Sequence, residues 1–375
     1  MRDYGYLNAR LRAMKTRLLS RAALESLSKA EGVAQLMTAL LSTAYKPDLE
    51  WGRLRQPGAA GLEEGLRRHV VVTVQKVAQY AAANPEASAI LRVLVSRWDV
   101  HNLRTLLRGQ HISAPSFEIR ESLLPVGSLD ESQLEELSGQ SSMKAVIDLL
   151  LVWGSPYARP LLAGYPDYAK THDLSALELK LDQFHYRYLC DVTRRRWPGS
   201  CLMAAVARRR PAGRSISGGR TFSVSLVREV VRREIDVVNI VTLLRLSREG
   251  LPPEECRRFY IPGGKAVSEE SFVKLAGKGV GELLTGLAGT PYAKVLEEAL
   301  PRFLERGAVS LLERRLEEYL VTQAVSLFRG DLLSSAVMIA YLYAKFNELT
   351  NLRLLARGKE VRMPEARLKE ALILV

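Results

Sequence analysis

Few side chains in this sequence have the types and spacing that catalysis or metal binding would need. Gly263-Gly264-Lys265 is followed by alanine and lacks the spacing of a phosphate-binding loop, and the glycines between 277 and 281 follow no strand pattern. The five histidines and three cysteines show no paired-ligand spacing, and no nucleophile motif occurs. We therefore expect no catalytic residue, no cofactor, no metal and no small-molecule substrate.

The polar residues that do recur belong to one phrase, in which an acidic residue is followed by asparagine, leucines and arginine at fixed spacing. At helical spacing the acid, the asparagine and the leucines share one stripe, whereas the arginines lie on the opposite side. A buried amide or carboxylate without a partner costs a few kcal/mol, so each should bond to another helix. The acids and asparagines are Asp99, Asn102, Asp236, Asn239, Glu348 and Asn351.

Two interpretations of this phrase stay open. The residues could be polar tethers that fix helix register inside each repeat, or they could form a ring that lines a central axis and contacts a partner. An unrecognised helical enzyme is a further alternative, because polar residues recur on packed faces.

Two other phrases repeat in step with the first. A Ser/Thr-Ala/Pro-Tyr phrase precedes each copy, and a capping residue with apolar residues four and seven places later lies earlier still. The tyrosines and capping residues are Tyr45, Tyr157, Tyr292, Ser20, Asp130 and Ser268. Three landmarks in the same order indicate a triplicated chain whose units are domain-sized rather than solenoid repeats. Three equivalent faces suit an assembly component better than a single-pocket enzyme.

Each unit is interpreted as helical, and the fold class is all-α. The capping residue begins a short helix that ends near the tyrosine phrase, and two longer helices follow. The turn between them lies near Asn84-Pro85 in the first unit and near Arg329–Asp331 in the third, and the second long helix is expected to stop at Gly109 or Gly358. Only the run 70–74 resembles a strand. We predict three related helical lobes at 1–115, 116–255 and 256–375.

Length and composition favour a soluble, cytoplasmic protein. The chain has 375 residues and 47% hydrophobic content, enough for a substantial core or several small ones. No apolar run reaches the length of a transmembrane helix, and the first residues contain no apolar signal segment. The cysteines form no CxxC pair, which indicates a reducing compartment. We expect neither a membrane span nor a signal peptide.

Positive charge is concentrated in one stretch of the middle unit. The chain has 54 Lys and Arg against 41 Asp and Glu, a net charge of +13. Residues 194–222 contain several prolines and glycines but no acid, and they lengthen the middle unit where its hairpin should turn. We interpret the stretch as an enlarged hairpin tip and a candidate interface. Its arginines are Arg194, Arg195, Arg196, Arg208, Arg209, Arg210, Arg214 and Arg220.

Composition alone does not identify what this hairpin tip contacts. It could be a solvated loop, or it could contact an anionic membrane surface, an acidic protein or nucleic acid. A basic helical scaffold that binds nucleic acid is therefore the main alternative function. It is disfavoured because no reader motif is present and Trp197 is the one aromatic for base stacking before Phe222.

The sequence resembles a known family. The opening Tyr4–Lys15, the tyrosine phrases, and Asn351-Leu352-Arg353 with Ala356–Lys359 are similar to the C subunit of the archaeal and bacterial V-type (A-type) rotary ATPases and ATP synthases. The eukaryotic counterpart is the d subunit of the vacuolar ATPase. The resemblance covers the whole chain. Two features depart from it, namely the long arginine-rich stretch and Phe346, where a polar residue is expected.

The resemblance implies a mechanical role and no catalytic site. It implies three lobes in a pseudo-threefold funnel, peripheral on the cytoplasmic face of the membrane. The expected partners are the subunits of the membrane rotor ring and of the central shaft, with anionic lipid headgroups as a further possible contact. Such a central-stalk socket couples ion flow to ATP synthesis or hydrolysis, and nucleic acid is not an expected partner.

Overall fold

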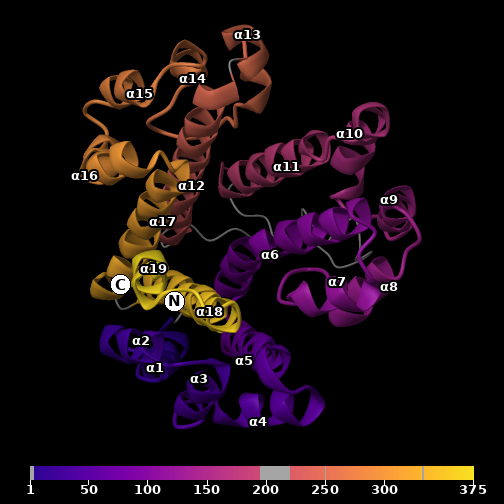
Figure 1. The fold of residues 1–375 in the computed structure, drawn as a ribbon, viewed down its shortest axis with the longest axis vertical. Helices are drawn as coiled ribbons and strands as arrows, with labels where there is room; N and C mark the ends of the chain where they lie inside the picture. The colour runs from indigo at the N-terminus through magenta and orange to yellow at the C-terminus, as the bar shows by residue number, and fades with distance from the viewer. Residues whose placement is uncertain (1–3, 195–219, 250, 332) are drawn as a thin grey trace. The chain divides into compact units, whose positions relative to one another are not determined.

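The computed structural model describes residues 4–194, 220–249, 251–331 and 333–375 (Figure 1). Every regular element in these ranges is a helix, so the all-α prediction is confirmed. Contacts divide the chain into two compact units. One unit contains Met1–Leu94 together with Glu318–Val375, and the other contains Val95–Glu317.

The first unit combines segments from both ends of the chain. The long helix α18 packs against α5 and α1, so the N-terminal and C-terminal segments share one core. The elements of this unit are α1 (Gly5–Lys15), α2 (Arg21–Ser28), α3 (Val33–Leu40), α4 (Lys46–Arg55), α5 (Gly58–Ala81), the start of α6 (Pro85–His111), the end of α17 (Val309–Ser326), η2 (Leu327–Arg329), α18 (Ala336–Glu360) and α19 (Glu365–Ala371).

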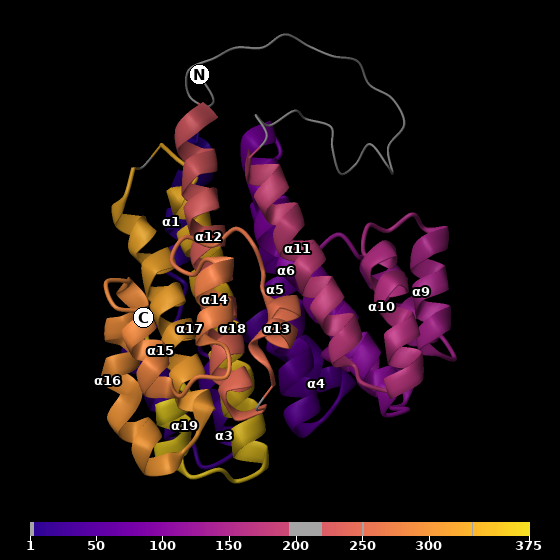
Figure 2. The same ribbon diagram turned by 90° about the horizontal axis from the view of Figure 1, so that it is seen from above.

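The second unit repeats the same series of short and long helices twice. Its long helices α11 and α12 pack against each other, and Figure 2 shows them side by side. After α6 come α7 (Ser116–Ser122), α8 (Glu131–Ser138), α9 (Met143–Val152), α10 (Ala158–Thr171), α11 (Ser175–Arg194), α12 (Arg220–Glu249), α13 (Pro253–Cys256), η1 (Arg257–Phe259), α14 (Glu269–Leu275), α15 (Val280–Gly286), α16 (Pro291–Arg306) and the start of α17.

The three predicted capping residues begin helices as expected. The Ser20 hydroxyl accepts a hydrogen bond from the Ala23 backbone N–H at 3.2 Å at the start of α2. Asp130 forms a complete capping box at the start of α8, and the Ser268 hydroxyl caps α14. Each cap satisfies a backbone N–H that has no partner within its helix. The turn predicted near Asn84-Pro85 lies between α5 and α6.

The structure contains more helices than the sequence pattern predicted. Two short helices, not one, separate each cap from the tyrosine phrase, because the second begins afresh at Gly32, Ser142 or Gly279. In the first and third repeats, the first of the two long helical segments is also interrupted. Pro57 interrupts it in the first repeat, and Gly307 adopts a left-handed conformation with φ of 64° in the third.

The glycines expected to end the long helices have a different role. Helices α6 and α18 continue past Gly109 and Gly358 to His111 and Glu360. A Cβ atom at Gly109 would lie 2.5 Å from Cγ1 of Ile119, and one at Gly358 would lie 2.3 Å from Cδ2 of Leu368. These glycines are therefore needed for the close approach of α7 and α19, and the prediction that they stop the helices is wrong.

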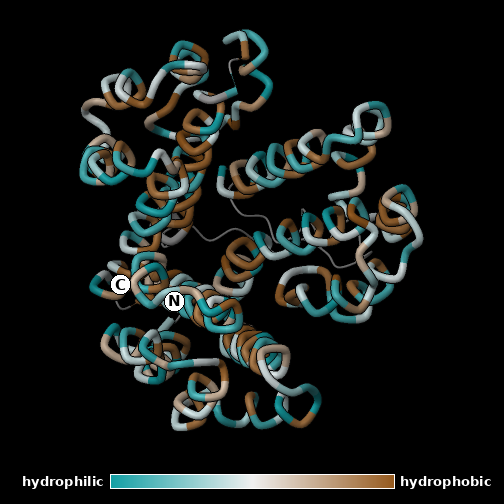
Figure 3. The backbone as a smooth tube through the Cα atoms, in the orientation of Figure 1, coloured by the Kyte–Doolittle hydropathy of each residue, from teal (hydrophilic) through white to brown (hydrophobic). Residues whose placement is uncertain are grey.

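The core consists of leucine-rich stripes of these amphipathic helices. In the second unit Leu103 and Leu106 of α6 pack with Leu161 of α10 and Leu177 of α11 in one buried cluster. Figure 3 shows hydrophobic and hydrophilic residues alternating along α10 and α11, the pattern of helices with one buried face. Residues 70–74, which resemble a strand, lie within α5.

Candidate functional site

The asparagine of the repeated phrase is held by a reciprocal pair of hydrogen bonds. Asn102 is fully buried on α6, and its Nδ2 donates to the carbonyl oxygen of Leu124 at 2.8 Å. The backbone N–H of Leu124 donates in return to Oδ1 of Asn102 at 2.8 Å. Leu124 lies in the extended segment just after α7. The partner is therefore a loop backbone, not the neighbouring helix that the sequence predicted.

The same pair of bonds occurs in the other two repeats. Asn239 bonds to the backbone of Ile261 after η1, and Asn351 bonds to the backbone of Ile373 after α19. The carbonyl oxygens of the first and third copies each have a second donor. The carbonyl oxygen of Leu124 also accepts from the backbone N–H of Val126 at 2.9 Å, and that of Ile373 also accepts from Nδ2 of Asn347 at 2.9 Å.

The acidic residue of the phrase binds a loop and the tyrosine of the next repeat along the chain. Asp99 accepts hydrogen bonds from the backbone N–H groups of Ser128 and Leu129 and from the Ser128 hydroxyl. The Tyr157 hydroxyl lies 3.5 Å from Oδ2 of Asp99. Gly127 is required beside this carboxylate, because a Cβ atom there would meet Oδ1 at 2.1 Å.

Asp236 repeats this arrangement in the second copy. Its Oδ1 accepts from three consecutive backbone N–H groups, those of Lys265, Ala266 and Val267. The Tyr292 hydroxyl donates to Oδ2 at 3.2 Å. Gly263 and Gly264, whose spacing does not fit a phosphate-binding loop, therefore lie in a turn that binds the Asp236 carboxylate. A side chain would not fit at Gly264, because its Cβ atom would lie 2.3 Å from Oδ1 of Asp236.

In the third copy the contact joins segments from the two ends of the chain. Oε1 of Glu348 accepts from the Tyr45 hydroxyl at 2.5 Å, and Oε2 accepts from the backbone N–H of Leu19 at 2.5 Å. Leu19 directly precedes the cap Ser20, as Leu129 and Val267 precede their caps. Where the other copies have further backbone donors, Glu348 has Nζ of Lys345 at 2.6 Å.

Burial perturbs the ionisation of these groups. Desolvation raises the pKa of Asp99 and of Asp236, although their hydrogen bonds act in the opposite direction. Desolvation and the neighbouring carboxylate raise the pKa of Tyr45 well above its usual value. The pKa of Lys345 is lowered by desolvation, which the nearby Glu348 opposes. Lys345 is 3% exposed, and sequence reasoning missed it despite its i,i+3 spacing to Glu348.

The arginine that ends each phrase makes a bidentate ion pair. Arg108 binds Glu178 of α11, and Arg245 binds Glu313 of α17 in the same way. Arg357 binds Glu63 of α5 as the third copy. The sequence placed these arginines opposite the buried stripe but did not identify their partners. Because the arginines are largely exposed, each pair contributes at most about 1 kcal/mol.

These contacts reach across the predicted lobe boundaries. The bonds of Asn102 cross the boundary at 115/116, and those of Asn239 cross the boundary at 255/256. The lobe boundaries and the tether role of the acids and asparagines stay predictions.

Phe346, the residue that departs from the resemblance, is 7% exposed on α18.

Of the arginine-rich stretch, the structure describes one complete side chain. Arg194 is the last residue of α11 and is exposed. Arg195, Arg196, Arg208, Arg209, Arg210 and Arg214 lie outside the described residues, and so does the side chain of Arg220.

Neither a metal site nor a membrane span is found in the described ranges. They hold no group of three His, Cys, Asp or Glu side chains that could bind a metal ion. No helix within them combines the length and the apolar composition needed to cross a bilayer.

Comparison with known proteins identifies the family of this chain. The model of the family described as ATP synthase (C/AC39) subunit matches residues 7–199 and 216–371, a match interrupted within the arginine-rich stretch. The C subunit of the A-type ATP synthase of Methanosarcina barkeri is 27% identical over 100% of this chain and 93% of its own length. The C subunit of the V-type ATP synthase of Deinococcus radiodurans is 27% identical, over 96% and 89% respectively. The chain therefore belongs to the ATP synthase (C/AC39) subunit family.

Proposed function

We propose that this chain is the non-catalytic socket of the central stalk of a rotary ATPase or ATP synthase. In this role it links the membrane rotor ring to the central shaft, so that ion flow is coupled to ATP synthesis or hydrolysis. Family membership and the names of the relatives support a role within such a complex. The socket role itself rests on the repeated contacts.

The observation that carries this proposal is the threefold repetition of one buried polar contact set. In each copy an asparagine on a long helix bonds to the backbone of the loop that follows, and an acidic residue on the same helix bonds to a tyrosine. We call this pair of contacts a clamp. A part that transmits torque must resist sliding between its helices. Buried, directional hydrogen bonds resist such sliding better than apolar packing alone, because a slip leaves polar groups unsatisfied.

The third copy strengthens this argument. It joins Tyr45 of the N-terminal segment to Glu348 of the C-terminal helix, with the buried Lys345 completing the cluster. The first unit therefore has the same clamp as the second, although its parts come from opposite ends of the chain. Three equivalent clamps suit a component placed over a ring of identical subunits.

The proposed partners are the rotor ring subunits and the shaft subunits, and the proposed location is peripheral on the cytoplasmic face of the membrane. Interfaces of this type depend on charge complementarity for docking and register. The net charge of +13 favours partners with acidic surfaces or anionic headgroups.

A bridging assay tests the socket role. The tagged shaft subunits are immobilised and mixed with the detergent-solubilised rotor ring, with and without this chain, after nuclease treatment of all components. The proposal predicts that the ring is retained only when the chain is present. A basic helical protein of similar size and charge serves as the control. Retention of the ring without the chain, or loss of all binding after nuclease treatment, would contradict the proposal.

A further inference from the structure

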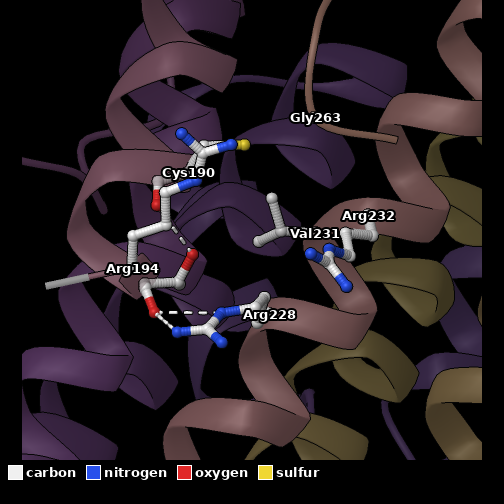
Figure 4. Close-up of a pocket in the computed structure, with 7 residues that line it drawn as sticks. Cys190, Arg194, Arg228, Val231, Arg232 and Gly263 are labelled. Carbon is white, nitrogen blue, oxygen red and sulfur yellow. Dashed lines mark hydrogen bonds between the residues drawn. The ribbon is translucent and has the colours of Figure 1, made fainter. Parts of the chain in front are cut away.

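A small basic cavity lies between the end of α11, helix α12 and the segment around Gly263 (Figure 4). Its volume is about 50 Å³, and it is lined by Cys190, Thr193, Arg194, Arg228, Val231, Arg232 and Gly263. The close approach of the Gly263 segment depends on the absence of a side chain. The φ angle of Gly263 is 115°, and a Cβ atom on this residue would lie 2.5 Å from Sγ of Cys190.

Three guanidinium groups surround this cavity. The guanidinium of Arg228 is fixed, because Nε and Nη2 both donate to the carbonyl oxygen of Thr193 at the end of α11. The side chains of Arg194 and Arg232 make no hydrogen bond or ion pair within the described part of the chain. Figure 4 shows Arg232 and Arg228 on α12 on the side of the cavity that faces Arg194.

The surrounding groups do not neutralise these arginines. Glu229 of α12 pairs with other cations, since it lies 3.3 Å from Arg233 and 4.0 Å from Lys265. Burial raises the pKa of the Cys190 thiol, so it is uncharged at neutral pH. Asp191 of α11 is exposed to solvent, but its charge reaches Cys190 and helps to raise the pKa of the thiol. The cavity is therefore bordered by three positive charges and a neutral thiol, with one carboxylate near its edge, and its net charge is positive.

We propose that the guanidinium groups of Arg194, Arg228 and Arg232 form a binding site for a small oxyanion of the phosphate class. Arginine forks match the geometry of phosphate oxygens and form charge-assisted hydrogen bonds with them. The volume suits one compact oxyanion, whereas an acidic peptide would need a longer groove. This site is independent of the proposed socket role.

The phosphate group could come from free phosphate or from a lipid headgroup, and both have the same recognition chemistry. Titration of the full chain with inorganic phosphate at low ionic strength, followed by calorimetry, tests the site itself. Sedimentation with vesicles of phosphatidylcholine, alone or mixed equally with phosphatidylglycerol, tests the lipid source. Inorganic phosphate is then added as a competitor to the vesicles.

Substitutions assign the binding to this cavity. Arg232→Gln and Arg194→Gln each remove a charge that has no partner within the described residues, so neither should disturb folding. Each should weaken phosphate binding about tenfold, the effect of one charge-assisted hydrogen bond. Arg187→Gln is the matched control, because Arg187 is exposed on the same helix but outside the cavity. It should change the affinity less than about twofold.

The outcomes separate clearly. Saturable phosphate binding that both cavity variants weaken supports the site, and competition with anionic vesicles then identifies the lipid headgroup as a source. Binding of phosphate without binding to vesicles supports the site with free oxyanion as ligand. Absence of saturable phosphate binding would overturn the proposal. Equal weakening by Arg187→Gln would also overturn it, because the effect would then reflect only general charge.

Discussion

Asn239 and Asn351 have the same place in their repeats, yet their replacement by leucine should have different costs. In Asn239→Leu the backbone N–H and carbonyl of Ile261 both lose their buried partner. At about 1–3 kcal/mol for each unsatisfied group, the loss of stability is about 2–6 kcal/mol. In Asn351→Leu the carbonyl of Ile373 keeps its bond from Asn347, so one group is left unsatisfied. The expected loss is then about 1–3 kcal/mol.

Urea unfolding of the full chain, followed by circular dichroism, measures these losses, and amide hydrogen exchange locates them. The backbone N–H of Ile261 should lose protection in Asn239→Leu, and that of Ile373 should lose it in Asn351→Leu. Thr350→Leu is the control, because Thr350 is exposed and its hydroxyl bonds only within its own helix. It should change stability by less than about 0.5 kcal/mol. Equal costs for Asn351→Leu and Asn239→Leu would show that the second donor does not protect the Ile373 carbonyl.

Three further predictions concern other parts of the chain. Burial, with a smaller contribution from Arg97 and Arg104, lowers the pKa of His185 to about 3. The folded state then binds fewer protons than the unfolded state, so stability is lost as pH falls below the unfolded pKa of about 6.5. The loss should be about 2 kcal/mol between pH 7 and pH 5, and His185→Gln should remove it; an unchanged pH slope in the variant would contradict this. Lys345→Met leaves the carboxylate of Glu348 buried without its cation and should cost about 3–5 kcal/mol in urea unfolding; Lys345→Met combined with Glu348→Gln should recover part of that loss, and no recovery would argue against the ion pair. Replacing residues 195–219 by a short Gly-Ser linker should preserve helix content and weaken assembly with the rotary complex mainly at low salt, since salt screens charge contacts beyond about 8–10 Å; equal binding over a salt series would refute the interface.

The helical class and the triplication could be predicted from the sequence because their signals are local and repeated. The caps Ser20, Asp130 and Ser268 lie at fixed distances from the tyrosines, and a cap needs only its own first turn. The burial of Asn102 followed from the leucine stripe that it shares on α6. These features depend on residues within a few positions of each other.

The partners of the polar residues could not be predicted, because they depend on how distant segments pack. The phrase indicates that Asn102 needs a hydrogen-bond partner, but it does not distinguish a helix from the loop at Leu124. In the sequence Lys345 is an ordinary charged residue at the end of an apolar run, and its burial depends on Glu348 and Tyr45 meeting across the chain. Glycine signals were ambiguous for the same reason, since Gly109 permits contact with Ile119 and does not stop the helix.

In the proposed role the chain transmits rotation between the membrane ring and the shaft. The most direct test measures ATP synthesis driven by an ion gradient in membranes reconstituted with the complete complex or with a complex that lacks only this chain. ATP hydrolysis by the catalytic head is measured in parallel. The proposed role predicts that, without the chain, gradient-driven synthesis is lost while the head still hydrolyses ATP, and that adding the chain restores synthesis. Gradient-driven synthesis that continues in the complex without the chain would contradict the proposal.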